Sequence, residues 1–211
     1  MERRLAAILA ADVAGYSMLM NTDEDATYIA WRSARAEVID PGIEARQGRI
    51  VKHTGDGFLA EFPTVLAAVD CAVNIQREMG RRNQDLADDR QFQFRIGINL
   101  GDIIVDSEDI HGDGVNIAAR LEAIASAGGV CISDDVYRQV RNKPGFEFAD
   151  LGEHSVKNIA APIQVYSVTG CGHSEGMPDL ATSSHAPAPG FTAENGGNPL
   201  EAMLENMAGA Q

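Results

Sequence analysis

Two aspartates, each at the end of a predicted strand, are the residues of this sequence best suited to chemistry. Asp12 follows the apolar run of residues 5–11 and precedes a short loop at residues 13–17. Asp56 lies in the glycine-containing turn of residues 54–57. Carboxylates are ligands of hard divalent cations, and glycine loops let backbone N–H groups approach phosphate oxygens. The pair therefore predicts a magnesium–triphosphate site.

A second set of polar residues opens a predicted helix near residue 113. Asn116 and Arg120 are four residues apart, so they share one helix face. The Arg120 guanidinium is a permanent cation with a planar fork that suits phosphoryl oxygens, and Asn116 can donate or accept a hydrogen bond. Taken alone, such a pair is more often a solvated helix face. Because the two aspartates are also present, the pair is better explained as part of a site that stabilises developing negative charge.

The elements that must position these residues follow from hydrophobic periodicity and turn signals. The pattern predicts a strand over residues 5–12 and a helix from a Thr22 cap to about residue 39, ended by Pro41. Residues 48–53 and 57–63 predict a hairpin, and Thr64 caps the next helix. The apolar positions expected to point inward in that helix are Leu66, Val69, Val73 and Ile75.

The second half of the chain continues the alternation. Strands are predicted over residues 92–101 and 103–105, and a helix over 113–126 ends at a Gly-Gly pair. A strand at 130–132, a helix after Ser133 and two terminal strands that end at residue 168 complete the series. The order predicts an α+β fold, a ferredoxin-like βαββαβ sandwich with additional C-terminal strands and helices.

The composition divides the chain into a predicted folded domain, residues 1–170, and a predicted disordered tail, residues 171–211. The tail has no Lys or Arg, holds four prolines and is rich in Gly, Ser and Ala, so it offers little apolar surface to bury.

The formal net charge is −14, which argues against binding to nucleic acid or to an anionic membrane surface. No run of 18 apolar residues is present, so membrane insertion is not expected. The three cysteines are scattered without a Cys-x-x-Cys pair, which favours reduced thiols and a cytoplasmic location over disulfides or zinc.

Five segments, taken in order, resemble the class III nucleotidyl (adenylate/guanylate) cyclase catalytic domain, in its compact bacterial subgroup. They are residues 12–17, 52–57, 95–101, 109–120 and 156–158, and the likeness covers about residues 4–168. A lone Gly-Asp-Gly would be a weak signal, but the five segments in family order are specific.

The resemblance implies the metal and phosphate ligands. Asp12, Asp56 and the backbone carbonyl of Val13 would hold two Mg²⁺ or Mn²⁺ ions per site. The triphosphate would lie against the loop of Gly15, Tyr16 and Ser17, and Lys157 would pair with its terminal phosphates.

The resemblance also implies how the base and the reacting phosphate are recognised. Lys52 and Asp109 would read the adenine edge, because guanine reverses the pattern of donor and acceptor. Asn116 would orient the ribose, and Arg120 would stabilise charge at the α-phosphorus. His53 and His111 are expected to be a strand and a turn residue without catalytic roles. Asp102 stands where many mammalian members carry an arginine that grips the triphosphate.

The expected activity is adenylate cyclase: conversion of ATP to 3′,5′-cyclic AMP and pyrophosphate at sites shared by a head-to-tail homodimer. Each site would take its metal carboxylates from one subunit and its purine-reading and transition-state residues from the other. Two alternatives stay open, a catalytically silent cyclase-like nucleotide-binding or regulatory module and a guanylate cyclase. A diguanylate synthase is disfavoured, because its Gly-Gly-Asp/Glu-Glu-Phe turn is replaced here by Gly55-Asp56-Gly57-Phe58.

Overall fold

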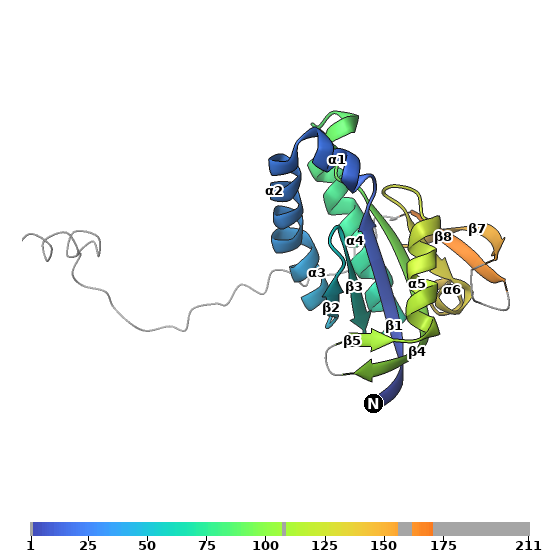
Figure 1. Cartoon of the computed structure of the whole chain (residues 1–211). Helices are drawn as coiled ribbons and strands as arrows, with labels where there is room; N and C mark the ends of the chain where they lie inside the picture. Colours follow the sequence, from blue (N-terminus) through green and yellow to red (C-terminus); the bar gives the residue numbers. More distant parts are fainter. Residues whose placement is uncertain (1, 107–108, 156–161, 171–211) are drawn as a thin grey trace, which may run out of the picture. The chain divides into compact units, whose positions relative to one another are not determined.

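The computed structural model describes residues 2–106, 109–155 and 162–170, all in the first of two units of the chain, Met1–Pro178. A sheet of eight strands forms its centre (Figure 1), in the order β2-β3-β1-β4-β6-β8-β7 with β5 paired to β4. The strands are β1 Glu2–Val13, β2 Arg49–His53, β3 Gly57–Phe62, β4 Phe94–Asp106, β5 Asp109–His111, β6 Val130–Ser133, β7 Glu147–His154 and β8 Ile163–Gly170. The helices are α1 Tyr16–Thr22, α2 Glu24–Ala34, α3 Asp40–Glu44, α4 Val65–Asn83, α5 Asp113–Ile124 and α6 Asp134–Val140, with a π-helical turn at Arg35–Ile39 and a 3₁₀ turn at Asp88–Arg90.

The four strands β2-β3-β1-β4 and the helices between them form the predicted ferredoxin-like βαββαβ unit, which is confirmed. β1 pairs antiparallel with both β3 and β4 at its centre. β6, β8 and β7 extend the sheet beyond β4 as the additional C-terminal strands. The predicted tail, residues 171–211, lies outside the described residues.

Both faces of β1 are buried from Ala6 to Ala11, which explains the unbroken apolar sequence there. Ala7, Leu9 and Ala11 belong to the core cluster that includes residues of α2 and α4. Ala6, Ile8 and Ala10 point to the other face and join a smaller cluster that includes Ala118 of α5. The smaller cluster lies beneath the predicted site residues, because Asp12 continues the Ala6–Ile8–Ala10 side of the strand.

The first helical region differs from the prediction at both ends. Asp23, not Thr22, caps α2 by accepting a hydrogen bond from Ala26 N at 3.0 Å. The Thr22 hydroxyl instead donates to Met18 O inside the last turn of α1. Pro41 does not end the helical path, because the π-helical turn before it widens the backbone and α3 then begins with the proline in its first turn.

The later elements match the prediction with two corrections. Thr64 caps α4 by accepting from Ala67 N at 3.1 Å, and Val69, Val73 and Ile75 are buried. Leu66 is 38% exposed, so its predicted inward position was wrong. The two strands predicted at 92–101 and 103–105 are a single strand, β4.

Two further observations concern the cysteine thiols and the helices. Cys71 and Cys131 are buried free thiols, and burial raises the pKa of Cys71 to about 12 and that of Cys131 to about 11. Both thiols therefore stay protonated. Among the described residues, no helix is both long and apolar enough to span a bilayer.

Candidate active site

The two aspartates expected to bind metal lie together at one end of the β1–β3 pair. Asp12 is opposite Gly57 in the strand register, and Val13 N donates to Asp56 O at 3.1 Å. A Cβ at Gly57 would lie 2.2 Å from Ala11 O. Only glycine therefore lets the β2–β3 turn close onto β1, and this closure brings the Asp56 carboxylate next to Asp12.

The carboxylate of Asp12 is held in an unfavourable electrostatic environment. Burial raises its pKa most, and the neighbouring Asp56 charge raises it further. Arg95 on β4 opposes both effects, because its Nη2 donates to Asp12 Oδ2 at 2.6 Å. The net result is a raised pKa, so ionised Asp12 destabilises the folded protein, and a bound cation would offset this cost.

Arg95 and Glu122 are site residues that the sequence analysis missed. Arg95 Nε lies 3.2 Å from Glu122 Oε1, and the Glu122 side chain is only 15% exposed. Burial raises the pKa of Glu122, while Arg95 lowers it. Arg95 falls within the segment 95–101 that resembles the cyclase family, but the resemblance assigned it no role. Its charge amid the buried alternation of Phe94, Ile96 and Ile98 was the available signal.

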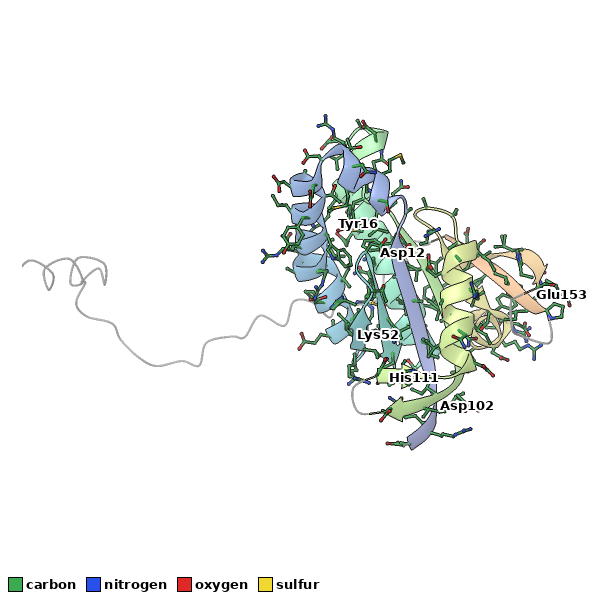
Figure 2. All side chains as sticks on the ribbon, in the orientation of Figure 1. Asp12, Tyr16, Lys52, Asp102, His111 and Glu153 are labelled. Carbon is green, nitrogen blue, oxygen red and sulfur yellow. The ribbon has the colours of Figure 1, made fainter. Side chains whose placement is uncertain are left out.

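The predicted purine readers, Lys52 and Asp109, form an ion pair. Lys52 Nζ donates to both carboxylate oxygens of Asp109 at 2.9 Å, and Ile110 N donates to Oδ1 at 2.8 Å. These hydrogen bonds, the one from Lys52 first, lower the pKa of Asp109. His111 Nε2 lies 3.8 Å from Asp109 Oδ2. In Figure 2, Lys52 and His111 lie towards one end of the sheet, and Asp12 and Tyr16 towards the other.

The loop after Asp12 turns the chain from β1 into α1. Gly15 has a φ of 70°, a conformation that favours glycine, and Met18 N donates to Gly15 O at 2.9 Å. The Tyr16 ring packs edge-on against Phe92 with centroids 6.4 Å apart, and this contact holds the loop against the core. Ser17 is exposed.

Asn116 and Arg120 are exposed on α5. Within the described part of the chain, neither side chain makes a hydrogen bond or ion pair with the Asp12–Asp56 pair or with the Lys52–Asp109 pair. One chain therefore brings the four predicted residues together as two separate pairs. It leaves Asn116 and Arg120 facing outward.

Glycines of β4 determine how closely α5 lies on the sheet. A Cβ at Gly97 would lie 2.1 Å from Glu122 N and 2.3 Å from Ala118 O. The helix backbone therefore rests directly on the strand, and this contact places Glu122 over Arg95.

Replacing Gly97 with alanine is expected to lower the free energy of unfolding by roughly 1–3 kcal/mol, because the new methyl group would overlap backbone that cannot yield without moving α5. Urea denaturation would measure the loss. Gly80→Ala is the matched control. A Cβ at Gly80, inside α4, meets nothing within 4 Å, so that variant should be as stable as the wild type or more stable. Equal stability of the Gly97→Ala variant and the wild type would contradict the close packing.

The oxygen donors present fit a hard divalent cation that shares its coordination with a substrate. Asp12 and Asp56 offer two carboxylates, and Mg²⁺ is commonly held by one or two carboxylates together with substrate phosphates and water. Among the residues that the structure describes, no group of three or more His, Cys, Asp or Glu side chains is arranged to hold a metal by itself. Water or substrate phosphate oxygens would supply the remaining ligands.

Asp12→Asn is expected to stabilise the metal-free protein, because it removes a partly buried charge beside Asp56 while keeping an oxygen for Arg95. A melting temperature about 2–4 °C higher in the presence of EDTA corresponds to about 1 kcal/mol for a domain of this size. Asp102→Asn, at an exposed position of β4, is the control and should leave the melting temperature unchanged. An Asp12→Asn protein that melts at or below the wild-type temperature would rule out this balance of charges.

Two residues named in the sequence analysis take no part in the contacts described above. Lys157 lies outside the described residues. Asp102 is exposed on β4, near the end of the strand that pairs with β5 (Figure 2).

Comparison with known proteins supports the same reading of the fold. Residues 3–170 match the family described as the adenylate and guanylate cyclase catalytic domain. A Rhizobium meliloti (strain 1021) protein named "Putative adenylate cyclase 3" is 43% identical over 209 residues, which are 98% of this chain and 34% of that protein. The chain thus spans about a third of the length of that relative.

Solved structures of cyclase domains share the fold of this chain. A crystal structure named adenylate/guanylate cyclase/hydrolase from Silicibacter pomeroyi is 49% identical, with a TM-score of 0.74 over 80% of this chain and 98% of that one. The adenylyl cyclase CyaB from P. aeruginosa shares the fold at 23% identity, with a TM-score of 0.69 over 80% of this chain and 96% of that one. The matched segments, the sheet topology and these relatives together show that the chain belongs to the adenylate and guanylate cyclase catalytic domain family.

Proposed function

We propose that the protein is an adenylate cyclase that converts ATP to 3′,5′-cyclic AMP and pyrophosphate. The observation that carries the choice of substrate is the Lys52–Asp109 ion pair. An ammonium can donate to an adenine ring nitrogen, and a carboxylate can accept from the adenine amino group. Guanine would present an acceptor to the carboxylate and a donor to the ammonium, and both charged groups would be mismatched.

The phosphate chemistry is assigned to the Asp12–Asp56 end. Asp12, Asp56 and the backbone carbonyl of Val13 would hold two Mg²⁺ or Mn²⁺ ions, which would supply a lowered pKa at the ribose 3′ hydroxyl and neutralise the triphosphate. The loop of Gly15, Tyr16 and Ser17 would line the triphosphate.

The ribose and the α-phosphate are assigned to α5. Asn116 would orient the sugar so that its 3′ oxygen is in line with the α-phosphorus, and Arg120 would stabilise the charge that develops as pyrophosphate leaves. Lys157 would pair with the terminal phosphates.

A homodimer is required by this assignment. Asn116 and Arg120 face outward, and in the described part of the chain they contact neither the carboxylate pair nor the purine readers. A second copy related by a two-fold axis can present its own α5 to the Asp12–Asp56 pair, and the symmetry then makes two equivalent sites.

A product assay tests the proposed function. ATP and GTP are each supplied with Mg²⁺ or Mn²⁺ over a range of protein concentrations. Cyclic AMP from ATP, with specific activity that rises with protein concentration, is the expected result. Cyclic GMP from GTP as the main product would favour a guanylate cyclase. Nucleotide binding without turnover under all conditions would favour a silent binding module.

Lys52→Glu is expected to shift preference from ATP towards GTP, by about tenfold or more in the ratio of kcat/KM, because a carboxylate at this position accepts from guanine. Lys143→Glu makes the same charge change at an exposed position and serves as the control. Steady-state kinetics with both nucleotides would measure the ratio. An unchanged ratio in Lys52→Glu would reject Lys52 as a purine reader.

A further inference from the structure

Arg95 lies between two carboxylates that belong to different elements. It is opposite Asp12 in the β1–β4 register, and Glu122 comes down onto it from α5. Its Nη2 atom contacts Asp12, and its Nε atom contacts Glu122. The Arg95 side chain is 34% exposed, the Asp12 side chain 25% and the Glu122 side chain 15%.

The two contacts of Arg95 are not equivalent. The contact with Asp12 is a complete hydrogen bond, from Nη2 to Oδ2 at 2.6 Å. The contact with Glu122 is incomplete. Arg95 Nε and Glu122 Oε1 are 3.2 Å apart, yet both atoms are buried and neither has a hydrogen-bond partner within the described part of the chain. Buried polar atoms without partners are costly and rare. The guanidinium therefore has a second acceptor at contact distance that it does not use.

This arrangement bears on how a cation reaches Asp12. The guanidinium is charged at every accessible pH and bonds strongly to carboxylates. With Asp12 Oδ2 bound to Arg95, an incoming divalent ion must compete for that carboxylate. Release of Arg95 would leave a partly buried charge unpaired unless another carboxylate receives it, and Glu122 is placed to do so.

We propose that Arg95 is a positioning residue that occupies Asp12 when no divalent cation is bound and shifts its guanidinium onto Glu122 when a cation binds. The inference rests on the metal site of the proposed function and adds an internal counter-ion to it. Arg95 keeps the carboxylate pair compensated before metal arrives, and Glu122 keeps Arg95 paired afterwards. The exchange makes metal affinity weaker than the carboxylates alone would provide.

Binding of Mn²⁺ to the full chain, without nucleotide, tests the exchange by calorimetry or by electron paramagnetic resonance. Arg95→Gln is expected to bind Mn²⁺ about tenfold more tightly than wild type, the effect of losing one competing charge-assisted hydrogen bond. Arg46→Gln is the matched control: Arg46 pairs with Asp70, away from Asp12, and its loss should change Mn²⁺ affinity little. A merely structural role for Arg95 predicts the opposite sign, because a misplaced Asp12 binds metal less well.

Two further variants separate exchange from simple charge. Glu122→Gln should weaken Mn²⁺ binding in the wild-type background and have a smaller effect in the Arg95→Gln background, where no guanidinium needs a receiver. Equal effects in both backgrounds would show only the field of one carboxylate and overturn the exchange. Arg95→Lys keeps the charge but offers a single nitrogen. It is expected to bind Mn²⁺ with an affinity between those of wild type and Arg95→Gln, and it remains informative if Arg95→Gln does not fold.

The outcomes distinguish this inference from the proposed function. If the wild type shows no Mn²⁺ binding that Asp12→Asn abolishes, the metal site itself is wrong and the exchange falls with it. If the wild type binds through Asp12 while Arg95→Gln and Arg95→Lys bind no more tightly, the metal site stands and the exchange is rejected.

Discussion

Mixing the Asp56→Ala and Asn116→Ala proteins, each inactive alone, is expected to restore about one quarter of wild-type activity. Random exchange makes half of the dimers mixed, and each mixed dimer has one site with intact carboxylates from one chain and intact α5 residues from the other. The physical reason is the separation seen in one chain, where Asn116 makes no described contact with the carboxylate pair. Cyclic AMP formation after subunit exchange measures the recovery.

A mixture of two variants that each change a metal-binding carboxylate provides the matched control. Asp12→Ala and Asp56→Ala both damage the carboxylate end, so every site in their mixed dimer has a defective metal half and no activity should return. No recovery in the first mixture, with subunit exchange verified, would count against sites shared between subunits. Recovery of equal size in the control mixture would do the same.

Arg120→Ala is expected to lower kcat by roughly 10²–10³-fold, the usual cost of removing one preorganised group that stabilises transition-state charge. The effect should fall on kcat rather than KM, because charge develops at the α-phosphorus only during the reaction. The fold should not suffer, since the Arg120 side chain is exposed and has no partner in the described part of the chain. Steady-state kinetics and a melting curve of the same preparation check both statements.

Arg138→Ala is the control for this prediction. Arg138 is an exposed arginine that pairs with Asp134 one turn earlier in α6. Its loss should leave kcat and KM unchanged, since exposed ion pairs within a helix contribute little. A drop of less than tenfold in kcat for Arg120→Ala, or an effect confined to KM, would show that Arg120 does not stabilise the transition state.

Local signals in the sequence were sufficient for most of the fold. Caps, turns and periodicity act over a few residues. The hairpin, α4 with its Thr64 cap and the succession of strands along the chain could therefore be predicted from them. The errors also have local causes. Pro41 usually ends a helix, but a π-helical turn absorbs it here. Leu66 fits the apolar pattern, but it lies in the first turn of α4 and stays 38% exposed.

The sequence by itself predicted the type of site. Asp12, Asp56, Lys52 and Asp109 are recognisable because each stands in a turn or at a strand end with characteristic neighbours. Only the tertiary structure decided which of them meet, and what else meets them. Lys52 and Asp109 are 57 residues apart, and Asp12 and Arg95 are 83 apart. Such contacts depend on strand register and on how closely α5 lies against Gly97. No pattern within a few residues encodes either, because both result from packing the whole sheet.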